Sequence, residues 1–205
     1  MRKLRRIFKN YQKRKYIKKF KSYGENVFVD LKNSTFSFET IDIGNNVFIG
    51  SGAYFAADLA IGNNVMFGPR VTILGGDHIF GIVGKSVRFL KPKGNENSLS
   101  VLIEDEVWCG ANVTILKGVK LGMGCVIGAG SVVTKEIPPY TVAVGNPCKP
   151  IKKIFTDEDL REHLMILDYL PKISEEVINR RYSLLALNGL NDLGYFQQIY
   201  EYTKM

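Results

Sequence analysis

One of the two histidines in the chain, His78, follows two glycines and an aspartate. Its imidazole has an unperturbed pKa of about 6.5, so it can accept a proton near neutral pH and act as a general base. The residue lies at the start of a long polar interruption, residues 77–100, in an otherwise periodic sequence. Because loops that leave a rigid scaffold commonly carry function, we expect His78 to be catalytic. A loop histidine without a role is the simpler alternative. Asp77 is a candidate for orienting its ring.

Lysine side chains gather toward the C-terminal end of the periodic region. Lys135, Lys149, Lys152 and Lys153 supply positive charge there. Ammonium groups close together suit the phosphates of a polyanionic ligand. A cluster of solvated surface lysines is the alternative interpretation, and other motifs must decide between the two.

The segments that position these side chains follow a six-residue repeat. From Ile43 the chain is written IGNNVF, IGSGAY, FAADLA, IGNNVM, FGPRVT, ILGGDH, and from Ile103 IEDEVW, CGANVT, ILKGVK, LGMGCV, IGAGSV, VTKEIP. Position one is Ile, Phe, Cys, Leu or Val in every hexad, position two is commonly Gly, and position five is mostly apolar or small. A period of six excludes an amphipathic helix and predicts short extended segments joined by corners. We expect the glycine at position two to permit the backbone conformation and the close approach that a corner needs. Three segments form a triangular coil, and stacked coils form an all-β solenoid.

Three further segments flank the solenoid. Residues 1–22 predict a basic amphipathic helix, and the solenoid domain is expected over residues 23–154, with an irregular first coil. Residues 155–205 predict a helical extension, with a first helix that begins near Thr156 and further helices over about 174–187 and 192–203.

The net charge of +8 is unevenly distributed. Residues 1–21 contain eleven Lys or Arg and no acidic residue, so the rest of the chain is slightly acidic, with 17 basic and 20 acidic residues. We therefore expect no nucleic-acid partner for the body of the protein. The basic segment 1–21 is either a solvated helix, a peripheral membrane contact or a partner-binding arm.

Cysteine usage and hydropathy indicate the cellular compartment in which the protein works. The three cysteines, at positions 109, 125 and 148, form no CxxC motif, and their spacing predicts buried free thiols in a reducing compartment. No apolar run reaches the ~18 residues of a membrane span, and the basic N-terminus lacks the apolar region of a secretory signal. These features predict a cytoplasmic protein, with peripheral contact at the membrane face as the alternative.

Residues 107–154 carry a more specific signal. The matching pieces are VWxGANV at 107–113, IGAGSVVTK at 127–135, IPPY at 137–140 and AVGNPCKxIK at 143–152. This stretch resembles the hexapeptide-repeat acyltransferases, in particular the galactoside, maltose and xenobiotic O-acetyltransferases and their polysaccharide-modifying relatives. The resemblance covers about residues 43–154. It implies a left-handed parallel β-helix, acetyl-CoA as acyl donor, a homotrimer and no metal.

The resemblance also implies roles for individual residues. His78 matches the catalytic base of the family, and Trp108 matches a residue near the acceptor. Cofactor-binding positions are matched by six residues, of which the alanines lie along the pantetheine arm and the others contact the nucleotide end of CoA: Ala111, Ala129, Thr134, Lys135, Lys149 and Lys152. Where the family often has Arg, this chain has Lys149, which supplies charge without a bidentate fork.

Direct acetyl transfer needs few groups. The thioester is already activated, so one base that deprotonates the acceptor and one donor that stabilises the oxyanion suffice. We therefore expect an acetyl-CoA-dependent O-acetyltransferase that acts on a sugar hydroxyl, in surface-polysaccharide biosynthesis. An N-acetyltransferase on an amino sugar and a non-catalytic scaffold solenoid remain alternatives.

Two other enzyme classes fit less well. A γ-type carbonic anhydrase shares the solenoid but needs three histidine ligands for zinc, whereas this chain has two histidines, and His163 falls in the expected helical extension. Serine acetyltransferases have a large helical N-terminal domain, and only about 42 residues precede the repeat here.

Overall fold

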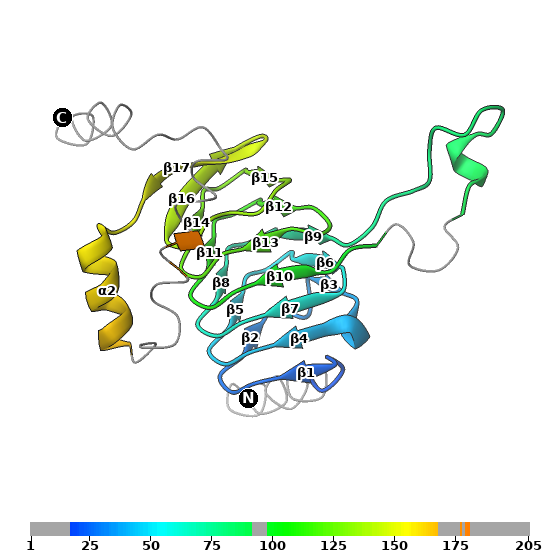
Figure 1. Ribbon diagram of the computed structural model, residues 1–205. Coiled ribbons are helices and arrows are strands. Elements are labelled where there is room, and N and C mark those ends of the chain that lie inside the picture. Colours follow the sequence, from blue (N-terminus) through cyan, green and yellow to red (C-terminus); the bar gives the residue numbers. More distant parts are fainter. Residues whose placement is uncertain (1–16, 92–97, 168–176, 178, 181–205) are drawn as a thin grey trace, which may run out of the picture.

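Short strands wind into a left-handed parallel β-helix of triangular cross-section in the computed structural model, which describes residues 17–91, 98–167, 177, 179 and 180 (Figure 1). Each side of the triangle is one sheet. Sheet A contains β1 (Ser22–Tyr23), β4 (Ile41–Ile43), β7 (Leu59–Ile61), β10 (Val101–Ile103) and β13 (Lys120–Leu121). Sheet B contains β2 (Phe28–Val29), β5 (Phe48–Ile49), β8 (Met66–Phe67), β11 (Trp108–Cys109), β14 (Val126–Ile127), β16 (Thr141–Gly145) and β17 (Cys148–Lys153). Sheet C contains β3 (Thr35–Phe36), β6 (Tyr54–Ala56), β9 (Thr72–Leu74), β12 (Thr114–Ile115) and β15 (Val132–Val133).

The coils stack in register along the whole solenoid. Strands pair in parallel with the strand one coil away, except for the antiparallel pair β16–β17. The register survives the interruption, because Val101 of β10 lies opposite Leu59 of β7. The interruption is therefore an insertion between two coils that would otherwise be consecutive.

The interior confirms the predicted repeat. Apart from Asp77, where the interruption begins, side chains at positions one and five of the hexads are buried, nearly all of them in one continuous core that includes Val47, Ile49, Val65, Phe67, Ile103 and Val107. Ser131 occupies one fifth position and is also buried. Its hydroxyl donates to the carbonyl of Gly128 at 2.7 Å and accepts the backbone N–H of Gly145 at 3.1 Å, so this polar group is satisfied.

The corners are made at position four of the hexad, whereas we expected glycine at position two to provide the corner conformation. Nine fourth-position residues have φ between 56° and 75°: Asn46, Gly52, Asn64, Arg70, Glu106, Asn112, Gly118, Gly124 and Gly130. Glycine and asparagine dominate because they adopt this left-handed conformation at least cost. The second-position glycines serve close approach instead. A Cβ on Gly110, for example, would lie 2.7 Å from the backbone nitrogen of Ala129 in the next coil.

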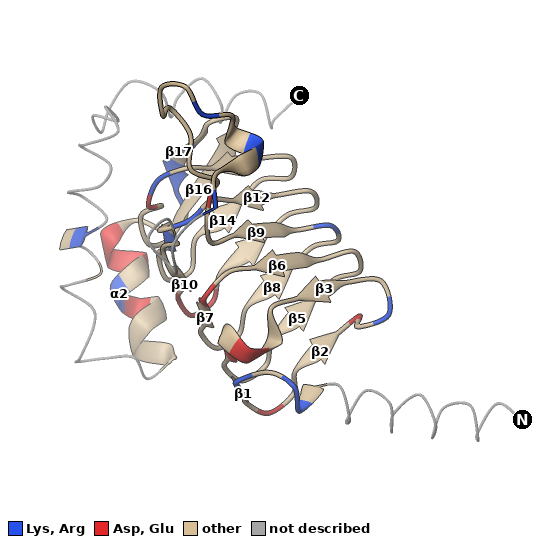
Figure 2. Ribbon diagram, turned by 90° about the vertical axis from the view of Figure 1, so that its right-hand side faces the viewer, with Lys and Arg blue, Asp and Glu red and all other residues tan. Residues whose placement is uncertain are grey.

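The C-terminal part closes the upper end of the solenoid. The β16–β17 hairpin contains a cis peptide between Asn146 and Pro147. Helix α2 (Asp157–Ile166) follows and confirms the first predicted C-terminal helix. It begins after Thr156, because the Thr156 hydroxyl caps it by accepting the backbone N–H of Asp159 at 3.1 Å. Leu160 and Leu164 of α2 pack with Met123 of the solenoid. Figure 2 shows α2 beside the stacked coils, with charged residues mainly in turns and on this helix.

The predicted segments at the chain ends fall largely outside the described residues. This applies to most of the basic helix over 1–22 and to most of the helices expected over 174–187 and 192–203. Ser22 already belongs to β1, so the solenoid begins slightly before residue 23. None of the helices that the structure describes is both long and apolar enough to cross a membrane.

The interruption leaves the solenoid as an arm, which we define as residues 77–100. It begins after β9 and returns to β10 at the corner between sheets C and A. Its described residues, 77–91 and 98–100, include the short 3-10 helix η2 (Val87–Phe89), and residues 77–91 extend away from the coils in Figure 1. A second 3-10 helix, η1 (Phe38–Thr40), lies between β3 and β4.

Candidate functional site

His78 is the second residue of the arm. It lies next to the corner between sheets C and A, and its side chain is exposed to solvent. Within the described part of the chain, no hydrogen bond or ion pair to the His78 ring is found. The neighbouring carboxylate of Asp77 forms an ion pair with Lys117 Nζ at 2.8 Å. Asp77 is thus engaged by the solenoid, and no hydrogen bond among the described residues joins its carboxylate to the imidazole.

Trp108 lies on the outer face of sheet B, in a row of apolar side chains that we call the sheet B row. Strand pairing places Phe28, Phe48, Met66 and Trp108 in successive coils. Each is 43–49% exposed, although all four are large and apolar. The rings of Phe28 and Phe48 stack with centroids 5.1 Å apart. An uncovered apolar row of this length is typical of a binding surface.

Ala111 and Ala129 lie at the corner between sheets B and C, in consecutive coils. Each follows its sheet B strand by two residues. The glycine that precedes Ala111 leaves no space for a side chain against the backbone of Ala129, so the coils approach closely here. Both alanines are at least partly accessible, and the corner can therefore offer backbone groups to an extended ligand.

The remaining predicted CoA contacts lie toward the C-terminal end of the solenoid. Thr134 and Lys135 are exposed in the turn after β15, at the corner between sheets C and A. Lys149 and Lys152 are exposed on β17. Lys152 lies opposite Val142 in the β16–β17 pair, which extends the sheet B row upward from Trp108. Lys149 and Lys152 therefore form the basic end of sheet B.

The structure brings together some of these residues and separates others. Trp108, Ala111 and Ala129 share sheet B and its corner with sheet C, and Lys149 and Lys152 continue sheet B. His78 projects from the corner between sheets C and A, with sheet C between it and this set, and Thr134 and Lys135 lie at the same corner two coils further along. One chain alone therefore places the predicted base on a different corner from Ala111 and Ala129, the predicted pantetheine contacts, whose corner we call the CoA groove.

Two features were missed from the sequence. The partners of Trp108 in the sheet B row, Phe48 and Met66, occupy position six of their hexads, which faces outward. The sequence did contain this signal, because every third hexad returns to the same sheet, so outward-facing apolar residues at position six of those hexads must lie in one row. The contact between Lys117 and Asp77 had no such signal, since Lys117 lies in a turn of one coil and Asp77 is the first residue of the arm that leaves another.

A charged network ties the C-terminal segment to the solenoid. Arg180 donates to Glu104 at 2.9 Å and also pairs with Glu136, and Lys120 Nζ lies 2.7 Å from Glu104. Burial acts to raise the pKa of Glu104. The hydrogen bonds from Lys120 and from the backbone of Met123, together with Arg180, outweigh it and hold that pKa below its ordinary value.

A second contact of this kind involves the other histidine. The Tyr140 hydroxyl donates to Glu106 at 2.7 Å, and His163 Nε2 lies 3.4 Å from the same carboxylate oxygen. His163 therefore holds α2 against the solenoid. Its place in α2, away from the arm, gives it a structural role.

The cysteines are buried free thiols, as predicted. Burial raises the pKa of the Cys148 thiol to about 11 and that of Cys109 further, so both stay protonated and unreactive near neutral pH. Among the described residues, no group of three or more His, Cys, Asp or Glu side chains is arranged to hold a metal ion.

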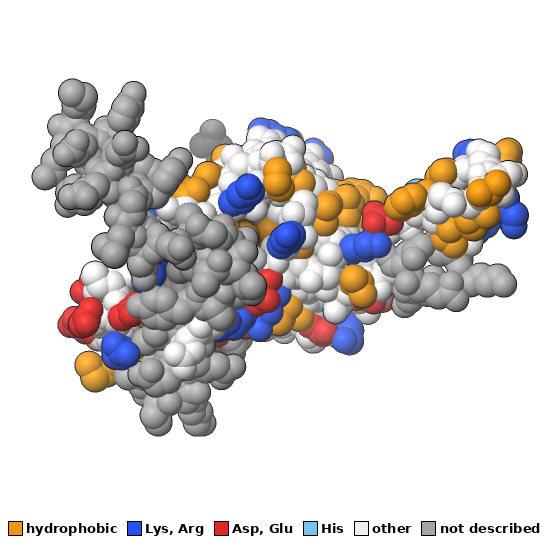
Figure 3. All heavy atoms as spheres, turned by 45° about the horizontal axis from the view of Figure 1, so that its top comes forward, with side chains coloured by type: hydrophobic (Ala, Val, Ile, Leu, Met, Phe, Trp, Pro, Cys, Tyr) orange, Lys and Arg blue, Asp and Glu red, His pale blue; other side chains and the backbone are white. Residues whose placement is uncertain are grey.

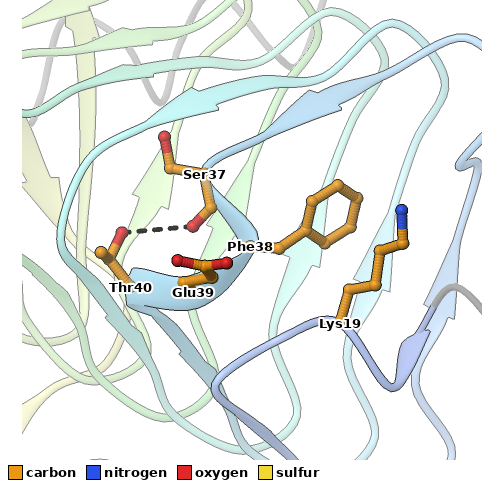
Figure 4. Close-up of a pocket in the computed structure, with 5 residues that line it drawn as sticks. All are labelled: Lys19, Ser37, Phe38, Glu39 and Thr40. Atoms are coloured by element: carbon orange, nitrogen blue, oxygen red, sulfur yellow. Dashed lines mark hydrogen bonds between the residues drawn. The ribbon is translucent and has the colours of Figure 1, made fainter.

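A pocket of about 510 Å³ lies at the opposite end of the solenoid, by the first coil. Figure 4 shows its lining, with the Lys19 ammonium 5.6 Å from the centre of the Phe38 ring and the Thr40 hydroxyl donating to the carbonyl of Ser37. None of the predicted site residues lines it. It is therefore separate from the candidate site.

Comparison with known proteins assigns the repeat. The family of the bacterial transferase hexapeptide (six repeats) matches residues 40–75 and 100–135. A putative acetyltransferase of Schizosaccharomyces pombe is 44% identical over 122 residues, which is 55% of this chain and 56% of that protein. The galactoside O-acetyltransferase of Lactococcus lactis is 38% identical over 154 residues, 71% of this chain and 69% of that protein.

Solved structures agree with the sequence matches. A hexapeptide-repeat acetyltransferase of Vibrio cholerae, complexed with acetyl coenzyme A, superimposes with a TM-score of 0.58 at 28% identity, and covers 68% of this chain and 74% of that chain. A polySia-specific acetyltransferase gives a TM-score of 0.55 at 28% identity, over 73% of this chain and 74% of that chain. Sequence, coil geometry and these matches agree, and the chain belongs to the family of hexapeptide-repeat acetyltransferases.

Proposed function

We propose that the protein transfers the acetyl group of acetyl-CoA directly to a hydroxyl of a sugar acceptor, with His78 as general base. The observation that carries this proposal is the position of His78, an exposed imidazole at the base of an arm that interrupts an otherwise uniform solenoid. The acetyl-CoA bound to the Vibrio cholerae relative and the galactoside named for the Lactococcus relative support the donor and the acceptor class.

The mechanism needs only groups that this family fold can supply. His78 takes the proton from the acceptor hydroxyl as the oxygen attacks the thioester carbonyl, and CoA leaves as the thiolate. Backbone N–H groups at the corner of Ala111 and Ala129 are positioned to follow the pantetheine arm. Lys135, Lys149 and Lys152 neutralise the phosphates at the nucleotide end. In the ternary complex no covalent enzyme intermediate forms.

We further propose that the active protein is a homotrimer with sites between subunits. A site completed by a second copy is supported by the positions of His78 and the CoA groove on different corners of one chain. The arm supports this arrangement, because Phe80, Val83 and Phe89 are 74%, 99% and 83% exposed. Figure 3 shows hydrophobic side chains gathered on the arm. In the trimer, the arm of one subunit covers the sheet B row of the next.

Release of free thiol from acetyl-CoA, measured against a panel of sugars, tests the function. We expect acetyl-CoA binding without acceptor and thiol release only with a saccharide that bears a suitable hydroxyl. Product analysis by mass spectrometry and by alkaline lability distinguishes an O-acetyl ester from an N-acetyl amide. An absence of acetyl-CoA binding would refute the proposal, and amide formation on an amino sugar would establish the N-acetyltransferase alternative.

Mixing two impaired variants, assayed at acetyl-CoA concentrations well below KM, tests the shared site. Subunits with His78→Ala retain the groove, and subunits with Lys149→Ala and Lys152→Ala, both on β17, retain the base. If each site uses the base of one subunit and the groove of the next, refolding them together restores about one site in four to full function. Mixtures no more active than the mean of the two parents would contradict the intersubunit site.

The acceptor and the location extend this proposal. We propose a polysaccharide or lipid-linked glycan acceptor at the cytoplasmic membrane face, in keeping with the polySia-specific relative and with the basic residues in segment 1–21. Deletion of residues 1–16, which leaves the buried Phe20 in place, should abolish sedimentation with vesicles that contain anionic lipid and leave turnover on a soluble acceptor intact. Unchanged sedimentation would refute the membrane contact.

A further inference from the structure

The arm leaves the solenoid through a narrow neck formed by Gly75, Gly76, Ser98 and Leu99. Gly76 and Ser98 form an antiparallel bridge. The carbonyl of Gly75 accepts both the Ser98 hydroxyl, at 2.9 Å, and the backbone N–H of Leu99, at 2.8 Å. These contacts fix the backbone of both neck strands as far as Gly76.

The next coil supports the neck from above. The N–H of Gly118 donates to the carbonyl of Leu99 at 3.3 Å, and a Cβ on Gly118 would lie 3.0 Å from the Leu99 side chain. The backbone of this turn is held in its own stack, because Leu116 donates to the carbonyl of Val133 at 3.0 Å. Lys117 therefore stands on a rigid turn directly beside the neck.

Lys117 reaches from this turn to the first residue of the arm. Its Nζ lies 2.8 Å from Oδ2 of Asp77, and the Lys117 side chain is only 30% exposed. Asp77 immediately precedes His78, whose ring has no hydrogen-bond partner within the described residues. The ion pair is thus the contact closest to His78 that joins the arm to the solenoid.

We propose that Lys117 is a positioning residue for His78, acting through Asp77. By holding the Asp77 carboxylate, it sets the direction in which the chain leaves the neck and so the place from which the imidazole approaches the reacting groups. This inference rests on the proposed function, in which His78 is the base. An exposed ion pair contributes little to stability, whereas displacing a catalytic group by about an ångström lowers turnover by up to about a hundredfold. The ion pair should therefore affect turnover much more than stability.

The central variant is Lys117→Ala in the full chain. We expect kcat to fall about tenfold, while KM for acetyl-CoA changes by less than about twofold and thermal unfolding stays near that of the parent. Lys117→Arg, which preserves the ion pair, should recover most of the turnover. Asp77→Asn should match Lys117→Ala, and the double variant should be no worse than either single one, because both remove the same contact.

Lys120→Ala is the matched control. Lys120 belongs to the same coil, its side chain is 34% exposed against 30% for Lys117, and it pairs with Glu104 at 2.7 Å, but on sheet A and away from the neck. Its removal should leave kcat unchanged. Wild-type turnover should also decline toward that of Lys117→Ala as salt is added, since screening weakens the same exposed pair.

The outcomes separate this inference from the proposed function. If His78→Ala retains turnover, the proposed function fails. If His78→Ala is inactive but Lys117→Ala is as active as Lys120→Ala, the positioning role is overturned and the base stands. A rise in KM for acetyl-CoA with kcat preserved would also overturn it, because it would make Lys117 a CoA contact. Failure of Lys117→Arg or Asp77→Asn to behave as stated would have the same effect.

Discussion

The coils and the arm differ in how their residues are held in place. In the coils, each residue is held by the strands above and below it, and corners repeat at position four with nearly the same φ. In the arm, the neck is held by hydrogen bonds, while apolar residues such as Val83 and Phe89 lie open to solvent. The coils obtain their order within one chain, whereas the arm presents surface that another copy can cover.

This difference matches a division of chemical labour. A long, extended cofactor needs a surface that keeps its shape over several coils, and a stacked solenoid provides it. In the proposed mechanism, the general base must reach the acceptor hydroxyl from outside that surface. An insertion with a hydrogen-bonded neck would give His78 this approach without breaking the register of the coils, since Val101 still pairs with Leu59.

The largest expected effect is that of replacing His78, at the base of the arm. Replacement by Ala should lower turnover by at least about a hundredfold, because a general base contributes 10²–10⁴-fold, while the Kd for acetyl-CoA by calorimetry stays unchanged. His163→Ala is the control, since this histidine lies in α2, away from the arm, and contacts Glu106 of the solenoid. Turnover of His78→Ala near the wild-type rate would remove the base from the proposed mechanism.

Glycine variants test how tightly the coils are fixed. Gly110→Ala forces a Cβ to within 2.7 Å of the backbone nitrogen of Ala129, and we expect a loss of about 1–3 kcal/mol in the free energy of unfolding. Gly130→Ala meets no neighbour but has φ +74°, so it should lose about 1 kcal/mol. Chemical denaturation at fixed protein concentration measures both, and a larger loss at Gly130 would contradict close approach as the stronger constraint.

Lysine variants test the groove separately from the arm. Replacing Lys135 and Lys152 by Ala should raise KM for acetyl-CoA about tenfold through loss of phosphate contacts and leave kcat nearly unchanged. Lys21→Ala is the control, because its partner Asp42 lies in the early coils, far along the chain from the basic end. A drop in kcat with constant KM would assign these lysines to the arm side of the reaction instead.

The coils were far more predictable from the sequence than the arm and the site. Every coil depends on residues at fixed spacing, so the hexad alone predicts that Ile103 and Val107 are buried. The fourth-position corners were also written in the sequence, in the asparagines and glycines, although we assigned the corner to position two. The neck could not be predicted, because the contact of Lys117 with Asp77 depends on how an insertion of arbitrary length returns to the stack. The proposed shared site could not be predicted either, because it would depend on a second chain.

The smallest expected effect compares two ion pairs as a function of pH. Glu104 has a pKa below its ordinary value of 4.5 in the folded chain, so its ionised form stabilises the fold at neutral pH. That contribution is fully present above the unfolded-state pKa and is lost as the pH falls below about 4.5 through the folded-state pKa. Glu104→Gln should therefore be less stable than the parent by about 1 kcal/mol at pH 7 and nearly equal to it in acid.

Denaturant titrations at several pH values measure this difference, and Asp77→Asn provides the comparison at the neck. Its ion pair with Lys117 is exposed, with the Asp77 side chain 59% accessible, so its loss should leave stability nearly unchanged across the same range. A stability deficit of Glu104→Gln that persists undiminished in acid would show that packing, not charge, links Glu104 to Lys120 and Arg180. A deficit of Asp77→Asn as large as that of Glu104→Gln would show that the neck stabilises the solenoid, and would erase the distinction between a contact that holds the fold and one that aims the base.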